Sequence, residues 1–221
     1  FEDRVLSAGY ENASNAAIEL LQARMKERHV PGVTVAVMVK GEIVWAQGIG
    51  MANLEYNLPV TPATKMRIGS VSKSVSSAAI GLLYEQGKLD MEAPVQKYVP
   101  NFPEKKWPIN TRQLAGHTAG IRHYRGMEFA SSKHYATVDA GLVIFKDDPL
   151  LFEPDTQYSY SSYGWNLLSA VVEGASGEEF LSYIDKNVFK PLGMNDTEAE
   201  YMDKLISNRT GFYVHSDGEF K

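Results

Sequence analysis

A long helical pattern begins at Ser70 and runs to Gln86, with Gly87 as a stop signal. Its apolar residues recur at the spacing of one helix face: Val71, Val75, Ala78, Ala79, Leu82 and Leu83. Ser70 and Lys73 stand three residues apart on the first turn, so a hydroxyl and an amine share a face of the helix. The pattern therefore predicts a buried helix with a reactive pair at its start.

The chemistry of this pair depends on proton transfer. A hydroxyl is a poor nucleophile until a base lies beside it, and the uncharged amine of Lys73 can be that base. The start of a helix favours developing negative charge and disfavours a protonated lysine. This is the arrangement of an acyl-enzyme serine hydrolase. The simpler alternative is a helix cap at Ser70 and a solvated Lys73, because roughly one Ser-x-x-Lys is expected by chance.

Composition describes an ordinary globular chain of 221 residues with 44% hydrophobic and 22% charged residues. The net charge of −5 argues against nucleic-acid binding. The longest apolar run, Val33 to Val39, has the length of a strand, so no membrane span is expected. Cysteine is absent, which excludes disulfides and thiolate metal sites, and no metal site or cofactor is expected. No signal peptide is visible at Phe1, which suggests a mature or trimmed form.

Periodicity places a first helix at Asn15–Arg28 with Ser14 as its cap. Strands follow at Val33–Val39 and Ile43–Ala46, and Gly48 and Gly50 are expected to end the second one. The later part reads as short helices and one strand entering a hairpin, over residues 89–98, 111–117, 138–145, 165–173, 178–188 and 211–214. A two-stranded hairpin is marginal by itself, so the sheet looks incomplete.

A second chemical cluster lies in the tyrosine- and serine-rich stretch from Gln157 to Leu168. A tyrosine close to a serine–lysine pair can relay protons between the nucleophile and the leaving group. The alternative is an aromatic loop that only packs against a helix.

An ordered series of short motifs over more than half of the chain resembles the serine β-lactamase and penicillin-binding protein superfamily, in its class C β-lactamase, carboxypeptidase and esterase branch. The matching segments, in order, are residues 67–73 (RIGSVSK), 87–90 (GKLD), 114–121 (LAGHTAGI), 160–168 (YSSYGWNLL), 174–177 (GASG) and 191–194 (PLGM) with Thr197. Residues 94–105 and 120–124 are most similar to the mitochondrial serine β-lactamase-like proteins and their bacterial relatives.

The resemblance implies an α/β (α+β) fold of the β-lactamase/transpeptidase type, with an antiparallel sheet flanked by helices and a helical subdomain. Residues 1–69 would form the first helix and strands of the sheet domain, 70–200 the nucleophile helix and helical subdomain, and 201–221 a return to the sheet domain. It also implies Ser70 as nucleophile, Lys73 as its proton acceptor and Tyr160 as a second acid/base, with Tyr160 preferred to Tyr158 by the spacing to the residues that follow.

The chain departs from the family pattern at two places. Ser162 stands where the family usually has asparagine, so contact with a substrate amide carbonyl is expected to be weaker. The third family motif, a tripeptide led by lysine or histidine, is expected on the C-terminal side of Lys221. His117-Thr118-Ala119-Gly120 only looks like it and is interpreted as a structural loop. We therefore expect C-terminal strands to be missing from this chain and to come from a further segment or a second chain.

Two functions follow from the resemblance. The first is a serine hydrolase that forms an acyl-enzyme at Ser70 and acts on a D-Ala-D-Ala-type peptide, a β-lactam or another small amide or ester. The second is a non-catalytic filament or scaffold protein that retains the fold. The resemblance also implies export to a bacterial periplasm.

Overall fold

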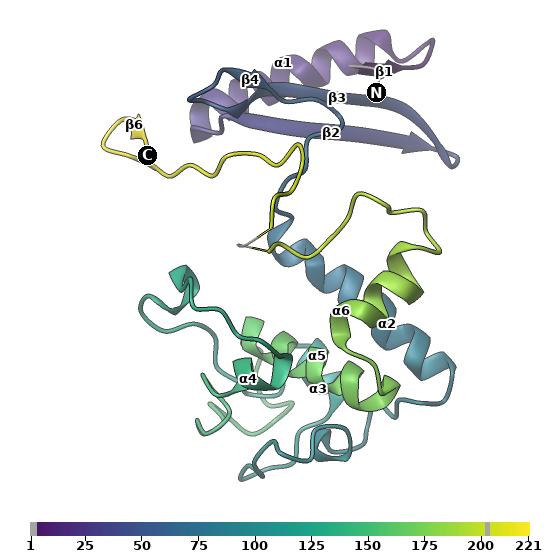
Figure 1. The fold of residues 1–221 in the computed structure, drawn as a ribbon, viewed down its shortest axis with the longest axis vertical. Coiled ribbons are helices and arrows are strands. Elements are labelled where there is room, and N and C mark those ends of the chain that lie inside the picture. The colour runs from purple at the N-terminus through teal and green to yellow at the C-terminus, as the bar shows by residue number, and fades with distance from the viewer. Residues whose placement is uncertain (1–3, 202–203) are drawn as a thin grey trace. The chain divides into compact units, whose positions relative to one another are not determined.

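The computed structural model describes residues 4–201 and 204–221, and its chain divides into two compact units. Unit 1 comprises residues 1–67 and 200–221, and unit 2 comprises residues 68–199. Unit 1 contains the sheet, and unit 2 is mainly helical (Figure 1).

The sheet of unit 1 is antiparallel and has β3 at its centre. β1 (Arg4–Leu6) and β2 (Gly32–Val39) flank β3 (Glu42–Asn53), and the short β4 (Leu58–Pro59) pairs with its far end. Among the described residues, no strand pairs with the outer edge of β2. The helix α1 (Glu11–Arg28) packs beside the sheet (Figure 1).

The first helix begins one turn earlier than the sequence predicted. It starts at Glu11, so Ser14 is not its cap. Ser14 is buried inside the helix, and its hydroxyl donates a hydrogen bond of 3.0 Å to the carbonyl of Glu11. Helical spacing is nevertheless visible in the half-buried residues Ala17, Ile18, Leu21 and Met25.

The expected end of the second strand at Gly48 and Gly50 was wrong, because β3 continues through both glycines to Asn53. A Cβ atom on Gly48 would lie 2.1 Å from the carbonyl oxygen of Val60, and one on Gly50 would lie 2.3 Å from that of Pro31. The glycines therefore permit close approach of neighbouring backbone rather than ending the strand.

The C-terminal segment returns along unit 1. The amide of Lys65 donates to the carbonyl of Asn208 over 2.9 Å, and the amide of Gly211 donates to Ala52 over 2.8 Å. The chain then forms a small hairpin of β5 (His215–Ser216) and β6 (Glu219–Phe220) around Asp217 and Gly218. The hairpin was expected, but residues 211–214 do not form the predicted strand.

Unit 2 is built around α5 (Ser162–Ser176). It packs against α2 (Ser72–Glu85), α3 (Thr111–Ala115), α4 (Val138–Leu142) and α6 (Phe180–Ile184), as Figure 1 shows. The core includes the fully buried side chains Leu83, Leu114, Leu142, Leu167, Leu168, Val171 and Val172. A 3₁₀ turn, η1 (Gly69–Val71), leads into α2, and a π-type turn, η4 (Asp185–Phe189), follows α6.

The predicted helices 89–98 and 165–173 of unit 2 differ most from the structure. Residues 89–98 contain only the 3₁₀ turn η2 (Val95–Lys97), because Pro94 interrupts helical backbone. The helix expected at 165–173 is longer at both ends: it begins at Ser162 and continues through Gly174. A Cβ on Gly174 would lie 1.9 Å from the carbonyl oxygen of Tyr98, so this glycine serves close packing, and Gly177 ends the helix at φ 72°.

Candidate active site

The sequence placed Ser70 and Lys73 on the first turn of one helix; in the structure Ser70 lies in the 3₁₀ turn η1, and Lys73 is the second residue of α2, which begins two residues later than predicted. Ser70 is exposed and Lys73 is half-buried one turn further on. The lysine Nζ lies 3.2 Å from Ser70 Oγ, which is within hydrogen-bond range. The predicted contact between hydroxyl and amine is thus present in the structure.

Tyr160 reaches the same serine from the segment before α5. Its hydroxyl donates to Ser70 Oγ over 2.6 Å, and Lys73 Nζ lies 4.9 Å from the centre of its ring. Hydrogen bonding from Lys73 and then from Ser70 lowers the pKa of the Tyr160 phenol below its ordinary value. The three side chains form one connected group of polar contacts.

Ser162 is the first residue of α5 and also faces Lys73. Its Oγ lies 3.4 Å from Lys73 Nζ. The start of α5 fixes this position, because Ser161 caps the helix by accepting a hydrogen bond of 2.9 Å from the amide of Gly164. All four predicted site residues therefore meet around the amine of Lys73.

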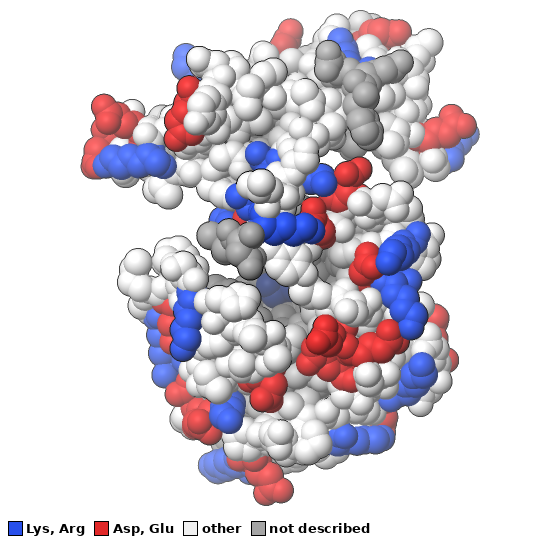
Figure 2. Space-filling model, in the orientation of Figure 1, with Lys and Arg blue, Asp and Glu red and all other residues white. Residues whose placement is uncertain are grey.

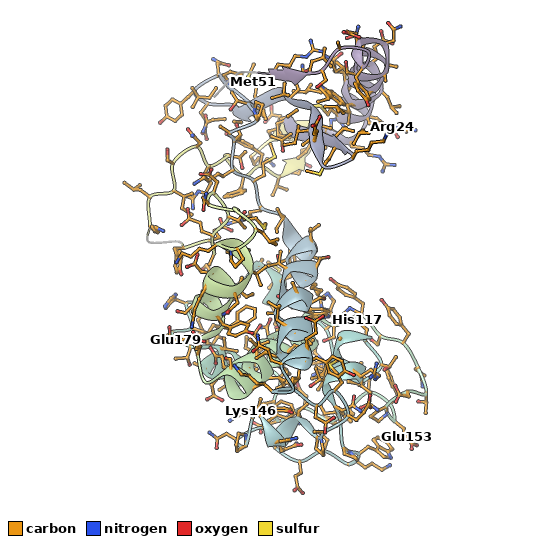
Figure 3. All side chains as sticks on the ribbon, turned by 90° about the vertical axis from the view of Figure 1, so that its right-hand side faces the viewer. Arg24, Met51, His117, Lys146, Glu153 and Glu179 are labelled. Carbon is orange, nitrogen blue, oxygen red and sulfur yellow. The ribbon has the colours of Figure 1, made fainter. Side chains whose placement is uncertain are left out.

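Two histidines that were not predicted as site residues line Tyr160. The ring centre of His117 lies 4.5 Å from that of Tyr160, and His123 meets the same ring edge-on at 5.3 Å (Figure 3 labels His117). The loop of His117 was interpreted as structural, and it does contact the tyrosine segment: the amide of Ser159 donates to the His117 carbonyl over 2.9 Å. The sequence feature that could have pointed to these residues is a pair of histidines in one motif-rich loop, about 40 residues before Tyr160.

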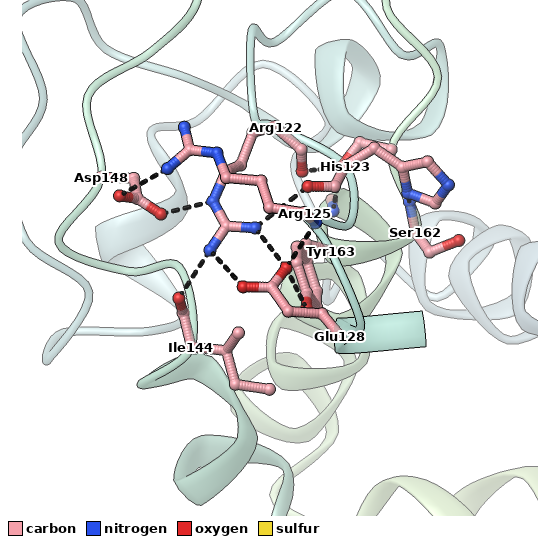
Figure 4. A network of polar contacts seen from close by, with 10 residues as sticks. Arg122, His123, Arg125, Glu128, Ile144, Asp148, Ser162 and Tyr163 are labelled. Carbon is pink, nitrogen blue, oxygen red and sulfur yellow. Dashed lines mark hydrogen bonds and ion pairs between the residues drawn. The ribbon is translucent and has the colours of Figure 1, made fainter. Parts of the chain in front are cut away.

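A buried arginine anchors the same loop. The Arg122 side chain is 6% exposed and pairs with Glu128 at 2.7 Å and with Asp148 (Figure 4). It also donates to the carbonyls of Ile144 at 2.9 Å and His123 at 3.0 Å. Hydrogen bonding from Arg122 lowers the pKa of Glu128 to about 2. Tyr163, whose hydroxyl donates to Glu128 over 3.0 Å, has a pKa raised to about 12 chiefly by burial.

Charges elsewhere do not gather into one surface on the face drawn in Figure 2, where basic and acidic side chains are interspersed. Within residues 4–201 and 204–221, no group of three or more metal-ligating side chains comes together. None of the helices in the part of the chain that the structure describes is long and apolar enough to cross a membrane.

The comparison with protein families matches residues 17–213 to the Beta-lactamase family model. The chain belongs to the beta-lactamase family. The predicted superfamily and the β-lactamase/transpeptidase-like fold are therefore confirmed.

Relatives of this beta-lactamase family chain come from several kinds of organism. The human "Serine beta-lactamase-like protein LACTB, mitochondrial" is 32% identical over 94% of the chain and 50% of the relative. "Penicillin-binding protein 4*" of Bacillus subtilis (strain 168) is 30% identical over 90% of the chain and 44% of the relative. An octameric penicillin-binding protein homologue from Pyrococcus abyssi has a TM-score of 0.79 at 27% identity, over 93% of this chain and 49% of that one. The chain spans about half the length of the curated relatives it matches.

Proposed function

We propose that this chain forms the nucleophile-bearing part of a serine hydrolase that acylates at Ser70. The observation that supports it best is that Ser70 Oγ lies within hydrogen-bond reach of both Lys73, at 3.2 Å, and Tyr160, at 2.6 Å. A group that only caps a helix has no need of two proton-transfer partners. Membership of the beta-lactamase family supports the same chemistry.

In the proposed reaction, Ser70 Oγ attacks the substrate carbonyl carbon while its proton passes to the neutral amine of Lys73. Tyr160 then donates a proton to the departing nitrogen or oxygen as the carbonyl reforms, which leaves an acyl ester on Ser70. Water attacks that ester, its proton returns through the same pair, and the acid product leaves. The lowered pKa of Tyr160 suits a phenol that both gives and receives a proton.

The proposed substrates are D-Ala-D-Ala-type peptides, β-lactams and other small amides or esters. Ser162 occupies the position that would meet a substrate amide, and its Oγ is already within 3.4 Å of Lys73 Nζ. A serine reaches less far than the asparagine usual in this family. We therefore place ester substrates ahead of β-lactams for this chain.

A strand from outside residues 1–221, or from a second chain, is proposed to complete the sheet along the free edge of β2. An apolar edge of this length, Gly32–Val39, is otherwise a template for aggregation. Hydrogen–deuterium exchange on the full-length protein tests this: slow exchange along the whole of β2 is expected, and fast exchange of alternate amides would contradict it.

Scaffolding without catalysis remains a second candidate. The structural relative from Pyrococcus abyssi is described as octameric, and this observation favours an assembly role. A bacterial periplasmic location stays an expectation from the resemblance, since the relatives include mitochondrial and bacterial proteins.

Turnover of a substrate panel separates the two candidates. The full-length protein should hydrolyse at least one of a p-nitrophenyl ester, a chromogenic cephalosporin and a D-Ala-D-Ala dipeptide, and its Ser70→Ala variant should hydrolyse none. Equal rates for the two proteins would reject the hydrolase and leave the scaffold.

A further inference from the structure

Two imidazole rings enclose the ring of Tyr160. His117 lies across it at 4.5 Å with an interplanar angle of 35°, and His123 meets it at 5.3 Å and 88°. Both histidines are half-buried and come from one loop, whereas the tyrosine comes from the segment before α5. Aromatic packing of this kind limits where the phenol can point.

Each histidine also binds the backbone beside the tyrosine. The Nδ1 of His117 accepts from the amide of Ser161 over 3.1 Å, and the Nδ1 of His123 accepts from the amide of Ser162 over 3.2 Å. These two amides directly follow Tyr160 in the chain. The His123 bond is visible in Figure 4. The two contacts thus hold the backbone on the C-terminal side of the catalytic phenol.

Accepting through Nδ1 dictates the protonation state of each ring. A neutral imidazole has a single N–H, so a ring that accepts at Nδ1 carries its proton on Nε2. A protonated ring would instead set an Nδ1–H against a backbone N–H. Both histidines therefore fit this structure in one of their three protonation states, the neutral Nε2–H tautomer.

The loop that carries the rings is itself fixed. The Ser161 hydroxyl donates a hydrogen bond of 2.6 Å to the backbone carbonyl of Arg122 in this loop. The buried Arg122 side chain also joins the loop to Glu128 and Asp148 through ion pairs. These contacts hold the backbone from which both rings project, so a lost ring hydrogen bond leaves the loop in place. The histidines are therefore placed by contacts that lie outside the reacting group.

Resting on the hydrolase function proposed above, we propose that His117 and His123 are positioning residues, which hold Tyr160 against Ser70 through the Ser161 and Ser162 amides only while both rings are neutral. They act through the backbone and the tyrosine ring and do not touch the reacting atoms in this scheme. A merely structural role would need the shape of the rings but not their acceptor nitrogens.

The surroundings of both rings keep them neutral near pH 7. The titratable groups that face them are Lys73 from α2, Tyr158 and Tyr160 from the segment before α5, Tyr124, and the other histidine. Burial is the first cause that lowers the pKa of both His117 and His123, and the charge that Lys73 carries when it is protonated adds to it. The two hydrogen bonds are therefore kept at neutral pH and lost as the pH falls through these lowered values, below about 6.5.

Asparagine provides the matched test, because its Oδ1 stands close to the place of Nδ1, accepts a hydrogen bond and does not titrate. The rate at which a fluorophosphonate labels Ser70 in the full-length protein is followed by intact mass from about pH 5 to about pH 8. We expect His123→Leu to slow labelling about tenfold or more near pH 8 and by less toward pH 5, where the parent has itself lost the bond, and His123→Asn to recover most of the loss near pH 8. In the parent, the labelling rate should fall toward pH 5 in part because the histidines become protonated. In the double variant H117N/H123N this part of the fall should be absent. Equal labelling rates for the two His123 variants, or an unchanged acid decline in the double variant, would overturn the proposal.

A second readout does not depend on activity. Nitrogen–proton correlation spectra of the imidazoles report which nitrogen carries the proton, and we expect Nε2–H for both rings near pH 7. An Nδ1–H on either ring overturns the proposal, whether or not the His123→Leu protein folds well enough to assay. If the parent protein is not labelled at all, the hydrolase function fails, while the spectra still decide whether the histidines hold this segment.

Discussion

The hydroxyl of Tyr160 lies 2.6 Å from Ser70 Oγ, nearer than the 3.2 Å that separates the serine from Lys73 Nζ. The tyrosine comes from a segment far along the chain, and the lysine from the turn that also holds the serine. The local pair is thus completed by a non-local partner. If the proposed chemistry holds, the tyrosine matters as much as the lysine.

Replacement of the proposed nucleophile Ser70 should give the largest loss of activity. Ser70→Ala should reduce kcat at least about 10³-fold, because it removes the hydroxyl that Lys73 reaches at 3.2 Å and Tyr160 reaches at 2.6 Å. The thermal midpoint should stay near that of the parent, since Ser70 is exposed. Ser76→Ala is the matched control: its hydroxyl bonds to the Ser72 carbonyl, at 3.1 Å on the same helix, and activity should be unchanged. A Ser70→Ala protein with parental turnover would remove the nucleophile assignment.

Tyr160→Phe isolates the phenol from its ring. The variant keeps the packing against His117 and His123 but loses proton donation, so kcat should fall about 10²- to 10⁴-fold. Unfolding free energy should change by only about 1 kcal/mol, the net worth of one hydrogen bond. Tyr158→Phe is the control, because Tyr158 is 68% exposed and no hydrogen bond joins it to Ser70 among the described residues. A larger loss from the Tyr158 change would show that the wrong tyrosine was chosen.

Ser162→Asn restores the residue usual in the family and tests substrate preference. The longer amide side chain should reach a substrate carbonyl that serine does not, so acylation by a penicillin should become faster relative to hydrolysis of a simple ester. The ratio of the two kcat/KM values is the measurement. Ser162→Ala serves as the comparison, and a ratio that moves equally in both variants would mean that amide reach is not the cause.

The buried arginine predicts a large loss of stability. Arg122→Met leaves Glu128 and Asp148 without their shared partner, and we expect the unfolding free energy to fall by about 3 kcal/mol or more. Arg125→Met should cost only about 0 to 1 kcal/mol, because Arg125 is 57% exposed and lies 3.5 Å from the same aspartate. Denaturant titration of both variants decides this, and equal losses would contradict it.

Acid should lower the unfolding free energy by protonating Glu128, the partner of Arg122, in a defined pH range. The pKa of Glu128 is lowered from 4.5 to about 2, so its stabilising contribution is complete above pH 4.5 and is lost as the pH falls to about 2. Glu128→Gln cannot titrate, so its unfolding free energy should fall less steeply across that window than the parent's. Denaturant titrations at several pH values measure both slopes, and parallel slopes would exclude Glu128 as the cause.

Sequence spacing correctly predicted the contacts between residues that are close together in the chain. The helix start that places Ser70 and Lys73 on one face follows from three-residue spacing, and the observed separation of 3.2 Å agrees with it. The choice of Tyr160 came from the family resemblance, because the spacing of the residues after it fits the family pattern. The structure brings that tyrosine to Ser70, while the catalytic role of each residue stays a prediction.

Non-local contacts explain what the sequence did not reveal. Gly48 and Gly174 look like breaks in a one-dimensional pattern, but each lets a distant carbonyl approach, that of Val60 or Tyr98. His117 and His123 gain their place only when their loop meets the segment before α5. In the sequence, nothing distinguishes Arg122 from an exposed arginine. It is buried because the fold brings the carboxylates of Glu128 and Asp148 to its side chain.

The most direct test of the central claim is the intact mass of the full-length protein before and after incubation with a fluorophosphonate, followed by peptide mapping. The proposed chemistry predicts one covalent adduct, located at Ser70, and no adduct in the Ser70→Ala variant. An adduct at a different residue, or a parent protein that stays unmodified while Tyr160 and Lys73 are intact, would contradict it.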